Sequence, residues 1–373
     1  MTDEQKLRQF GALIVRLQQR QDLSRAEARE AYLQIWRNEQ PELQQGAFIS
    51  ALRAKGETLE EVLGVADSHN QEWLAHCGGK VSAPEPHLGI VGVGMDSLKT
   101  TNVSSGAAIL AAACGLYVHK VGAPGMTGMS GCADAFALLG IDADAPVSRI
   151  HASVRESRLG FSSAVGAATR STGIFRVLSQ LRCGTTVHMA GPIGFHSEDE
   201  RNKIIGVPHP GQVPLVIEVM RQMGYERALV PCGGSDEYVD RFMDEFSNLG
   251  TTHVAELRNG KIREFEVRPE EFGLSVARYA DVAAADTREH NVQRLLRVLA
   301  GKERGPVLDL VCLNAAFCLY LMDKVSSVKE GVARAREAVA QGHALEQVRR
   351  TIRAQNADPT AGLQRLDAFL AES

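Results

Sequence analysis

The first 75 residues alternate apolar and polar positions with the spacing of amphipathic helices. Phe10, Ile14 and Leu17 recur at intervals of three and four residues, which places them on one helical face. Ser24 and Thr58 are each followed three residues later by a glutamate, an N-cap signature in which both side chains bond to the first helical turn. The pattern predicts a small bundle of short helices.

The periodicity changes after Gly79. A linker-like stretch at residues 82–86 is followed by short apolar runs, a small-residue helix at 105–114 and further helical segments. The strand candidates are residues 88–91, 116–119, 185–188, 227–230, 253–257 and 307–311. Alternation of strands and helices predicts an α/β sheet that is largely parallel. Residues 328–340 form an amphipathic helix that Gly342 is placed to end, and the tail to residue 373 is expected to be helical.

The fold class expected from these patterns is a small N-terminal α-helical domain followed by a large α/β domain. We place the helical domain at residues 1–78 and the α/β domain at 84–373. The segment at about 155–182 is a candidate for packing with the helical domain. A chain of 373 residues is long enough for two domains of this size.

Composition narrows the classes of function. The net charge of −4 argues against a surface that coats nucleic acid or binds membranes through lysine and arginine, although a local basic groove stays possible. The longest apolar runs, such as 107–114, fall short of the roughly 20 residues needed to cross a bilayer. The first residues are polar and lack the apolar core of a secretion signal, so we expect a cytoplasmic protein.

The cysteine and histidine residues indicate neither disulfides nor zinc. Seven cysteines lie at irregular spacings without a Cys-x-x-Cys pair, and no two of the eleven histidines form a His-x-x-x-His pair. We expect reduced, mostly buried thiols.

The first candidate site is the loop at residues 92–105. Gly92 and Gly94 allow the backbone to approach an anion, and the amides of the following helix carry partial positive charge. Asp96 suits a sugar hydroxyl or a cation, so the loop is typical of a phosphate-plus-sugar cradle. A capped strand-to-helix turn without ligand is the alternative. Ser97 replaces the third glycine of a dinucleotide motif, and no Walker lysine is present.

Two further candidates follow other strands. Lys120 begins a glycine-rich loop whose Ser130 precedes a helix and could donate to phosphate; a solvated surface lysine is the alternative. Asp236 and Glu237 suit magnesium, and the alternative is an acidic first turn of a helix. A phosphate cradle, a cation and a magnesium pair would together suit a phosphorylated sugar that loses pyrophosphate.

Several short motifs in the right order resemble the anthranilate phosphoribosyltransferase family. The family pattern Gly-Thr-Gly-Gly-Asp is similar to residues 92–96, and its Ser-Gly-Ser-Ala-Asp is similar to residues 130–134. Further matches lie at residues 24–63, 100–105, 120–124, 236–237, 268–274, 313–316 and 329–332. The resemblance covers nearly the whole chain.

This resemblance implies a phosphoribosyl pyrophosphate donor, magnesium, a homodimer formed through the helical domain and a place in tryptophan biosynthesis. The residues that would face the donor are Gly92, Gly94, Asp96, Thr100, Asn102, Ser104, Ser105, Lys120 and Ser130. The residues that would hold magnesium are Ser104, Asp236 and Glu237.

The chain departs from the family in both donor loops and in the acceptor segment. The donor-loop departures are Val93, Met95, Ala123, Pro124 and Cys132. The family's acceptor His-Pro-Ala falls on residues 168–170 and its carboxylate-binding arginine on Leu178, which cannot pair with a carboxylate. Arg170, Arg176 or Arg182 could supply a displaced cation.

Three interpretations stay open. The protein is a phosphoribosyltransferase with an aromatic or nitrogenous acceptor other than anthranilate, an anthranilate enzyme with an unusual pocket, or an inactive paralogue. The inactive paralogue would bind a ligand or, against the acidic charge balance, nucleic acid.

Overall fold

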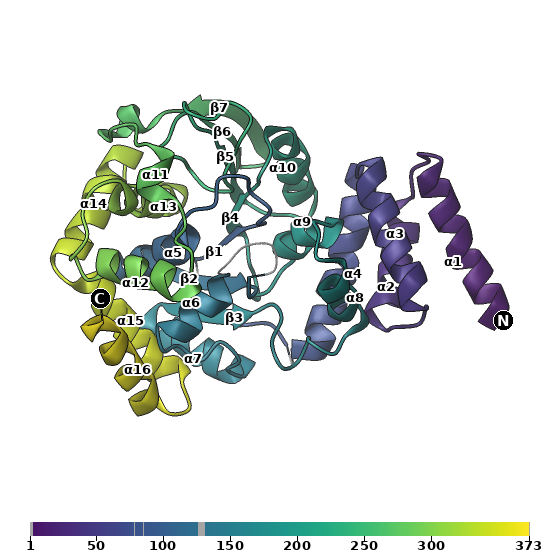
Figure 1. The fold of residues 1–373 in the computed structure, drawn as a ribbon, viewed down its shortest axis with the longest axis horizontal. Helices are drawn as coiled ribbons and strands as arrows, with labels where there is room; N and C mark the ends of the chain where they lie inside the picture. Colours follow the sequence, from purple (N-terminus) through teal and green to yellow (C-terminus); the bar gives the residue numbers. More distant parts are fainter. Residues whose placement is uncertain (1–2, 78, 85, 126–130, 373) are drawn as a thin grey trace. The chain divides into compact units, whose positions relative to one another are not determined.

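The computed structural model describes residues 3–77, 79–84, 86–125 and 131–372 (Figure 1). The chain folds into two compact units. The first unit comprises residues 1–80 and 165–196, and the second comprises residues 81–164 and 197–373. The chain therefore leaves the second unit after residue 164 and returns to it at residue 197.

The first unit is helical, as the sequence predicts. Its helices are α1 (Asp3–Gln18), α2 (Arg25–Trp36), α3 (Glu42–Lys55), α4 (Leu59–Cys77), α8 (Gly173–Leu181) and α9 (Thr186–Ile193). The predicted N-caps are confirmed: Ser24 and Glu27 form a capping box at α2, and Thr58 and Glu61 exchange equivalent bonds at α4. Glu61 is fully buried and also accepts the Leu23 N–H at 2.9 Å, so one carboxylate ties two helix starts together.

The prediction of a strand at residues 185–188 is wrong. Thr185 is the N-cap of α9, and the imidazole of His188 lies within hydrogen-bond distance of its hydroxyl and its N–H. Val187, Ala190 and Ile193 then bury one face of the helix at intervals of three. The bonds between Thr185 and the His188 ring close the first turn of a helix here, where β-branched residues alone favour a strand.

The second unit contains a seven-stranded sheet with the order β3-β2-β1-β4-β5-β6-β7. Neighbours from β3 to β5 are parallel, whereas β6 and β7 continue the sheet antiparallel. The strands are β1 (His87–Gly92), β2 (Tyr117–Gly122), β3 (Leu159–Ser163), β4 (Asn202–Gly206), β5 (Arg227–Gly233), β6 (Thr252–Arg258) and β7 (Lys261–Val267). The predictions of β1, β2, β5 and β6 are confirmed, and so is the α/β class.

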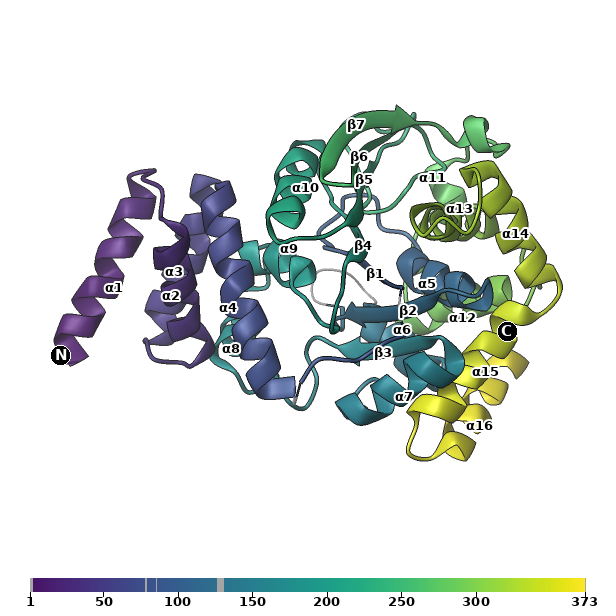
Figure 2. The same cartoon turned by 180° about the vertical axis from the view of Figure 1, so that it is seen from behind.

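Helices surround this sheet (Figures 1 and 2). They are α5 (Val103–Ala113), α6 (Cys132–Leu138), α7 (Val147–Ser157), α10 (Val213–Gln222), α11 (Tyr279–Val282), α12 (Arg288–Leu299), α13 (Pro306–Leu321), α14 (Val328–Ala340), α15 (His343–Gln355) and α16 (Pro359–Ala371), with the short 3₁₀ turns η1 (Pro210–Gln212) and η2 (Pro269–Phe272). The predicted helix at 328–340 and the helical tail are confirmed.

The prediction of a strand at residues 307–311 is wrong, because these residues lie in α13. This helix is apolar on almost every side, so a short window of it cannot be told from a buried strand by periodicity. Pro306 occupies its first turn, a position where proline is favoured. The small residues of α5 serve close packing against this helix: a Cβ at Gly106 would lie 2.8 Å from Val311.

None of the helices in the described part of the chain is long and apolar enough to span a membrane.

Candidate functional site

The first glycine loop leaves the end of β1 and folds over a buried carboxylate. Gly94 and Met95 both adopt positive φ, +75° and +64°, which turns the backbone sharply. A Cβ at Gly92 would overlap the Asp244 carboxylate, and the Gly94 N–H donates to Asp244 Oδ2 at 2.6 Å. Gly92 is therefore needed for close approach to an anion, which in this structure is the Asp244 side chain, whereas Gly94 is favoured by its positive φ.

Asp96 lies in the same loop and is held by a lysine. Its Oδ1 accepts from Lys99 Nζ at 2.6 Å, and its side chain is only 9 % exposed. Burial, followed by repulsion from Asp244, raises the pKa of Asp96 to about 6 against the pull of Lys99. The loop thus contains a carboxyl group that is destabilised in its charged form.

The N-terminus of α5 presents the hydroxyl residues predicted to face a donor. Asn102 is the N-cap residue, and Thr100 forms an isolated backbone bridge with Ala283. The Oγ of Ser105 is buried without a hydrogen-bond partner among the described residues, whereas Ser104 Oγ accepts from Lys120. The helix N-terminus and these hydroxyls suit an anion.

Lys120 is a buried cation near the end of β2. Its side chain is 1 % exposed, and Nζ donates to the Ile90 carbonyl at 3.1 Å and to Ser104 Oγ at 3.3 Å. Both partners are neutral, and no carboxylate of the described residues lies within ion-pair distance of Nζ. A buried ammonium normally requires a negative partner, so the solvated-surface alternative does not apply.

Asp236 and Glu237, predicted as the magnesium pair, have other partners here. Asp236 is exposed and forms a two-pronged ion pair with Arg268, at 2.8 and 3.2 Å, which lowers the pKa of its carboxyl. Glu237 accepts the Tyr279 N–H at 2.6 Å. Both carboxylates therefore have protein partners in this structure, and their role as magnesium ligands with Ser104 stays a prediction.

A second Asp-Glu pair, which the sequence reasoning missed, lies beside the glycine loop. Asp244 is buried under Gly92 and Gly94, and Glu245 follows it with a buried Oε2 that has no hydrogen-bond partner among the described residues. Burial, then repulsion from Asp244 and Asp96, raises the pKa of Glu245 well above its ordinary value. The available signal was the repeated Asp-Glu eight residues after the first pair, just before β6.

Asn314 of α13 fixes the chain immediately after this second pair. Its Oδ1 accepts the Phe246 N–H at 3.0 Å, and its Nδ2 donates to the Phe246 carbonyl at 2.9 Å. The Phe246 ring stacks on Phe317 with centroids 3.5 Å apart. The segment 313–316 singled out in the sequence thus positions Asp244 and Glu245.

The second glycine loop is held by one carboxylate. Asp134 Oδ2 accepts the N–H groups of Gly125 and Gly131 at 2.8 and 2.9 Å, and its Oδ1 pairs with Arg288 at 3.1 Å. A Cβ at Gly122 would overlap the sulfur of Cys132. Ser130, predicted to face the donor, lies outside the described residues.

The predicted acceptor segment lies in the first unit. Leu178, which replaces the expected arginine, is buried on the inner face of α8. Arg176 on the same helix forms an ion pair with Glu42, so its charge already has a partner. Arg170 and Arg182 in the same segment are exposed and form no ion pair with a described residue.

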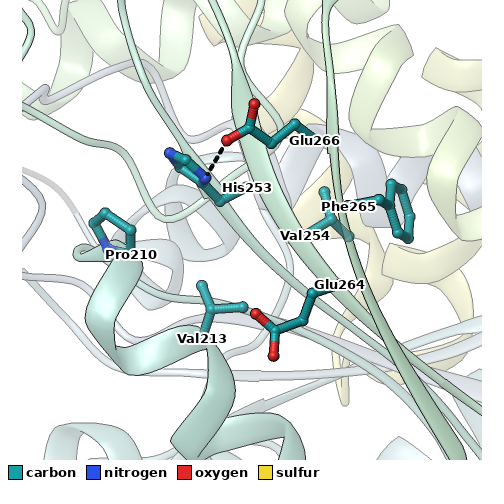
Figure 3. Close-up of a pocket in the computed structure, with 7 residues that line it drawn as sticks. All are labelled: Pro210, Val213, His253, Val254, Glu264, Phe265 and Glu266. Atoms are coloured by element: carbon teal, nitrogen blue, oxygen red, sulfur yellow. Dashed lines mark ion pairs between the residues drawn. The ribbon is translucent and has the colours of Figure 1, made fainter.

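A separate cavity of about 280 Å³ lies on the antiparallel side of the sheet (Figure 3). It is lined by Pro210, Val213, His253, Val254, Glu264, Phe265 and Glu266. His253 Nδ1 and Glu266 Oε1 form an ion pair of 2.9 Å across its wall. None of the residues predicted to bind donor or metal lines it.

Comparison with known proteins places both units in one family. The a/b domain model of the glycosyl transferase family matches residues 85–345, and its helical bundle domain model matches residues 12–69. Anthranilate phosphoribosyltransferase from Chelativorans sp. is 35 % identical over 339 residues, covering 90 % of this chain and 95 % of the relative. The enzyme of the same name from Parvibaculum lavamentivorans is 34 % identical and covers 93 % and 98 %.

Solved structures agree in fold. Anthranilate phosphoribosyltransferase from Thermus thermophilus has a TM-score of 0.78 at 28 % identity, covering 96 % of this chain and 99 % of its own. The Saccharomyces cerevisiae enzyme, solved in complex with PRPP and Mg, has a TM-score of 0.78 at 22 % identity, covering 98 % of each chain. The chain belongs to the anthranilate phosphoribosyltransferase family, with its helical bundle and a/b domains.

Proposed function

We propose that this protein transfers the phosphoribosyl group of phosphoribosyl pyrophosphate to an aromatic or nitrogenous acceptor. The observation that carries the proposal is Lys120, a fully buried ammonium whose two hydrogen-bond partners are neutral. Glu245 interacts with Lys120 electrostatically, but no carboxylate of the described residues forms an ion pair with its Nζ, so an anion that binds beside it would stabilise the ammonium. Family membership and the saccharomycete relative solved with PRPP and Mg support a phosphorylated sugar as that anion.

Magnesium is the cofactor we propose, held by Asp244 and Glu245. The fit rests on Glu245 Oε2, a buried oxygen without a hydrogen-bond partner among the described residues, and on the raised pKa values of Asp96 and Glu245. A divalent cation would favour the charged form of these carboxyls and take oxygen ligands of this kind. No three His, Cys, Asp or Glu side chains within the described ranges are grouped to hold a metal. Phosphate oxygens and water would therefore complete the coordination.

The residues around the loop can then act on the departing pyrophosphate. Bound magnesium would neutralise charge on the two phosphates. The Lys120 ammonium and the N-terminal amides of α5 would hold the phosphates while the bond between the ribose carbon and oxygen breaks. Ser104, which accepts from Lys120, would be oriented toward the same group. The chain needs no strong base for this step, because positioning and charge stabilisation supply most of the rate.

The acceptor that we propose is not anthranilate. Leu178 is buried on its helix, and Arg176 is already paired with Glu42. The position that the family's arginine fills is thus apolar, and an anthranilate carboxylate would depend on Arg170 or Arg182, which are exposed and form no ion pair with a described residue. An acceptor without a carboxylate at that point, such as a neutral nitrogen heterocycle, does not need an arginine at position 178. A homodimer through the helical unit remains a prediction from the family.

The proposal is tested by titrating the protein with phosphoribosyl pyrophosphate in a calorimeter, with and without magnesium. We expect binding that requires magnesium, and a Lys120→Met variant should lose about 10- to 100-fold in affinity, the loss of a charge-assisted contact. Wild-type protein that gives no heat with donor and magnesium would refute the donor assignment.

Turnover is measured separately, with anthranilate and with a panel of neutral nitrogen heterocycles. Release of pyrophosphate with anthranilate as the sole effective acceptor would contradict the acceptor proposal. Donor binding without turnover on any acceptor would instead support the interpretation of an inactive paralogue.

A further inference from the structure

Two surface segments of the second unit are bonded to the far half of the first glycine loop. Ser97 and Phe242 are joined reciprocally: the Ser97 N–H donates to the Phe242 carbonyl at 3.0 Å, and the Phe242 N–H donates to Ser97 Oγ at 2.9 Å. The second segment is α11 and the residues after it. The Ala284 N–H donates to the Lys99 carbonyl at 2.9 Å.

Tyr279 connects these segments to the loop. Its phenol donates to the same Lys99 carbonyl at 3.0 Å, so this oxygen accepts two hydrogen bonds from residues 180 and more positions away in the chain. The Lys99 ammonium in turn binds Asp96 at 2.6 Å. The position of the Asp96 carboxyl therefore depends on how firmly the Lys99 backbone is held.

Glu237 holds Tyr279 from the other end. A Glu237 carboxylate oxygen accepts the Tyr279 N–H at 2.6 Å, at the first turn of α11. Asp236 beside it is fixed by Arg268, which also donates to Thr251 at 3.1 Å. Glu237 is thus connected to the first glycine loop through Tyr279, whereas Asp236 is held by Arg268 away from that loop.

We infer that Glu237 and Tyr279 are positioning residues that fix the first glycine loop through the Lys99 backbone. The inference rests on the proposed donor binding at this loop. It assigns Glu237 a hydrogen-bond acceptor role that a glutamine carbonyl could fill equally well. A magnesium ligand at position 237 would instead require the carboxylate charge.

The first test compares Tyr279→Phe with Tyr238→Phe. The two rings pack edge to face with centroids 5.8 Å apart, but the structure shows no hydrogen bond from the Tyr238 hydroxyl to any described residue. We expect Tyr279→Phe to raise the KM for phosphoribosyl pyrophosphate about fivefold with kcat within about twofold, the effect of one lost hydrogen bond. Tyr238→Phe should leave both constants unchanged. Equal constants for the two variants would overturn the inference.

The second test compares Glu237→Gln with Glu237→Ala by calorimetry with donor and magnesium. Glutamine should keep wild-type affinity, whereas alanine should weaken binding about fivefold or more. A Glu237→Gln variant that loses magnesium-dependent binding as fully as Glu237→Ala would overturn the positioning role and assign position 237 to the metal.

Hydrogen–deuterium exchange separates this inference from the proposed function. Amides 97–100 should exchange faster in Tyr279→Phe than in Tyr238→Phe without any donor present. If wild-type protein fails to bind the donor, the proposed function is wrong, but the exchange rates still show whether the Tyr279 hydroxyl holds the Lys99 backbone. Unchanged exchange in Tyr279→Phe would overturn the positioning role whatever the donor result.

Discussion

Replacing Asn314 with alanine tests whether α13 holds the Asp244–Glu245 pair in place. The side chain is buried, and it satisfies both the N–H and the carbonyl of Phe246, which is 1 % exposed. Truncation leaves two buried backbone groups without partners, each at a cost of about 1–3 kcal/mol. Some relaxation follows, so we expect a loss of roughly 2–4 kcal/mol in the free energy of unfolding.

The measurement is urea unfolding of the full chain, with Cys312→Ala as the matched control. Cys312 is equally buried on the same helix, and the structure shows no hydrogen bond from its thiol to a described residue. Cys312→Ala removes little more than one buried sulfur atom, so it should lower the free energy of unfolding by about 1 kcal/mol. Asn314→Ala should in addition weaken magnesium-dependent donor binding, because Asp244 and Glu245 lose their anchor. If Asn314→Ala costs no more than Cys312→Ala, the two bonds to Phe246 do not hold this segment and the reasoning fails.

Three further predictions concern the same site. Met95→Gly should raise the free energy of unfolding by up to about 1 kcal/mol, because φ of +64° strains any residue with a Cβ; unchanged or lower stability in a denaturant titration would contradict this. Lys120→Met should unfold at the same or a higher temperature than wild type, because the variant no longer buries an ammonium, while its affinity for the donor falls. A lower unfolding temperature together with the lower affinity would show that Lys120 has a structural role alone. Between about pH 4 and 6 the folded state binds more protons than the unfolded chain, because the pKa of Asp96 is raised to about 6, so this group lowers stability as pH rises through that window. Asp96→Asn should flatten the slope of stability against pH there, and an unaltered slope would count against it.

The sequence predicted those elements whose signals are local. The capping pairs at Ser24 and Thr58 lie within one helical turn, and the strands near residues 88 and 227 are apolar runs that end in glycine. Tertiary packing decided the rest. Strand β4 begins with Asn202 and Lys203, which are polar yet buried, so only the short pair Ile204 and Ile205 gives it an apolar signal.

Lys120 illustrates how far residue types carry a site prediction. Its place after an apolar run and before a glycine loop correctly indicated a strand end. Nothing in that pattern tells that the ammonium is 1 % exposed, because burial depends on the packing of Ile90 and Ser104 from other elements. That burial turns a common surface residue into an argument for a bound anion.

The two Asp-Glu pairs between β5 and β6 mark the limit of the sequence more sharply. Both follow a strand of the sheet, both are adjacent carboxylates, and spacing alone favours the pair nearer to β5. The decisive fact is a contact across 150 residues, in which Asp244 accepts the Gly94 N–H. The glycine at position 92 is required by this carboxylate, because any Cβ there would overlap it. Gly92 in the first glycine loop is therefore required by Asp244, which lies before β6. Asp236 and Glu237 have Arg268 and Tyr279 as partners instead, and neither accounts for a glycine in that loop.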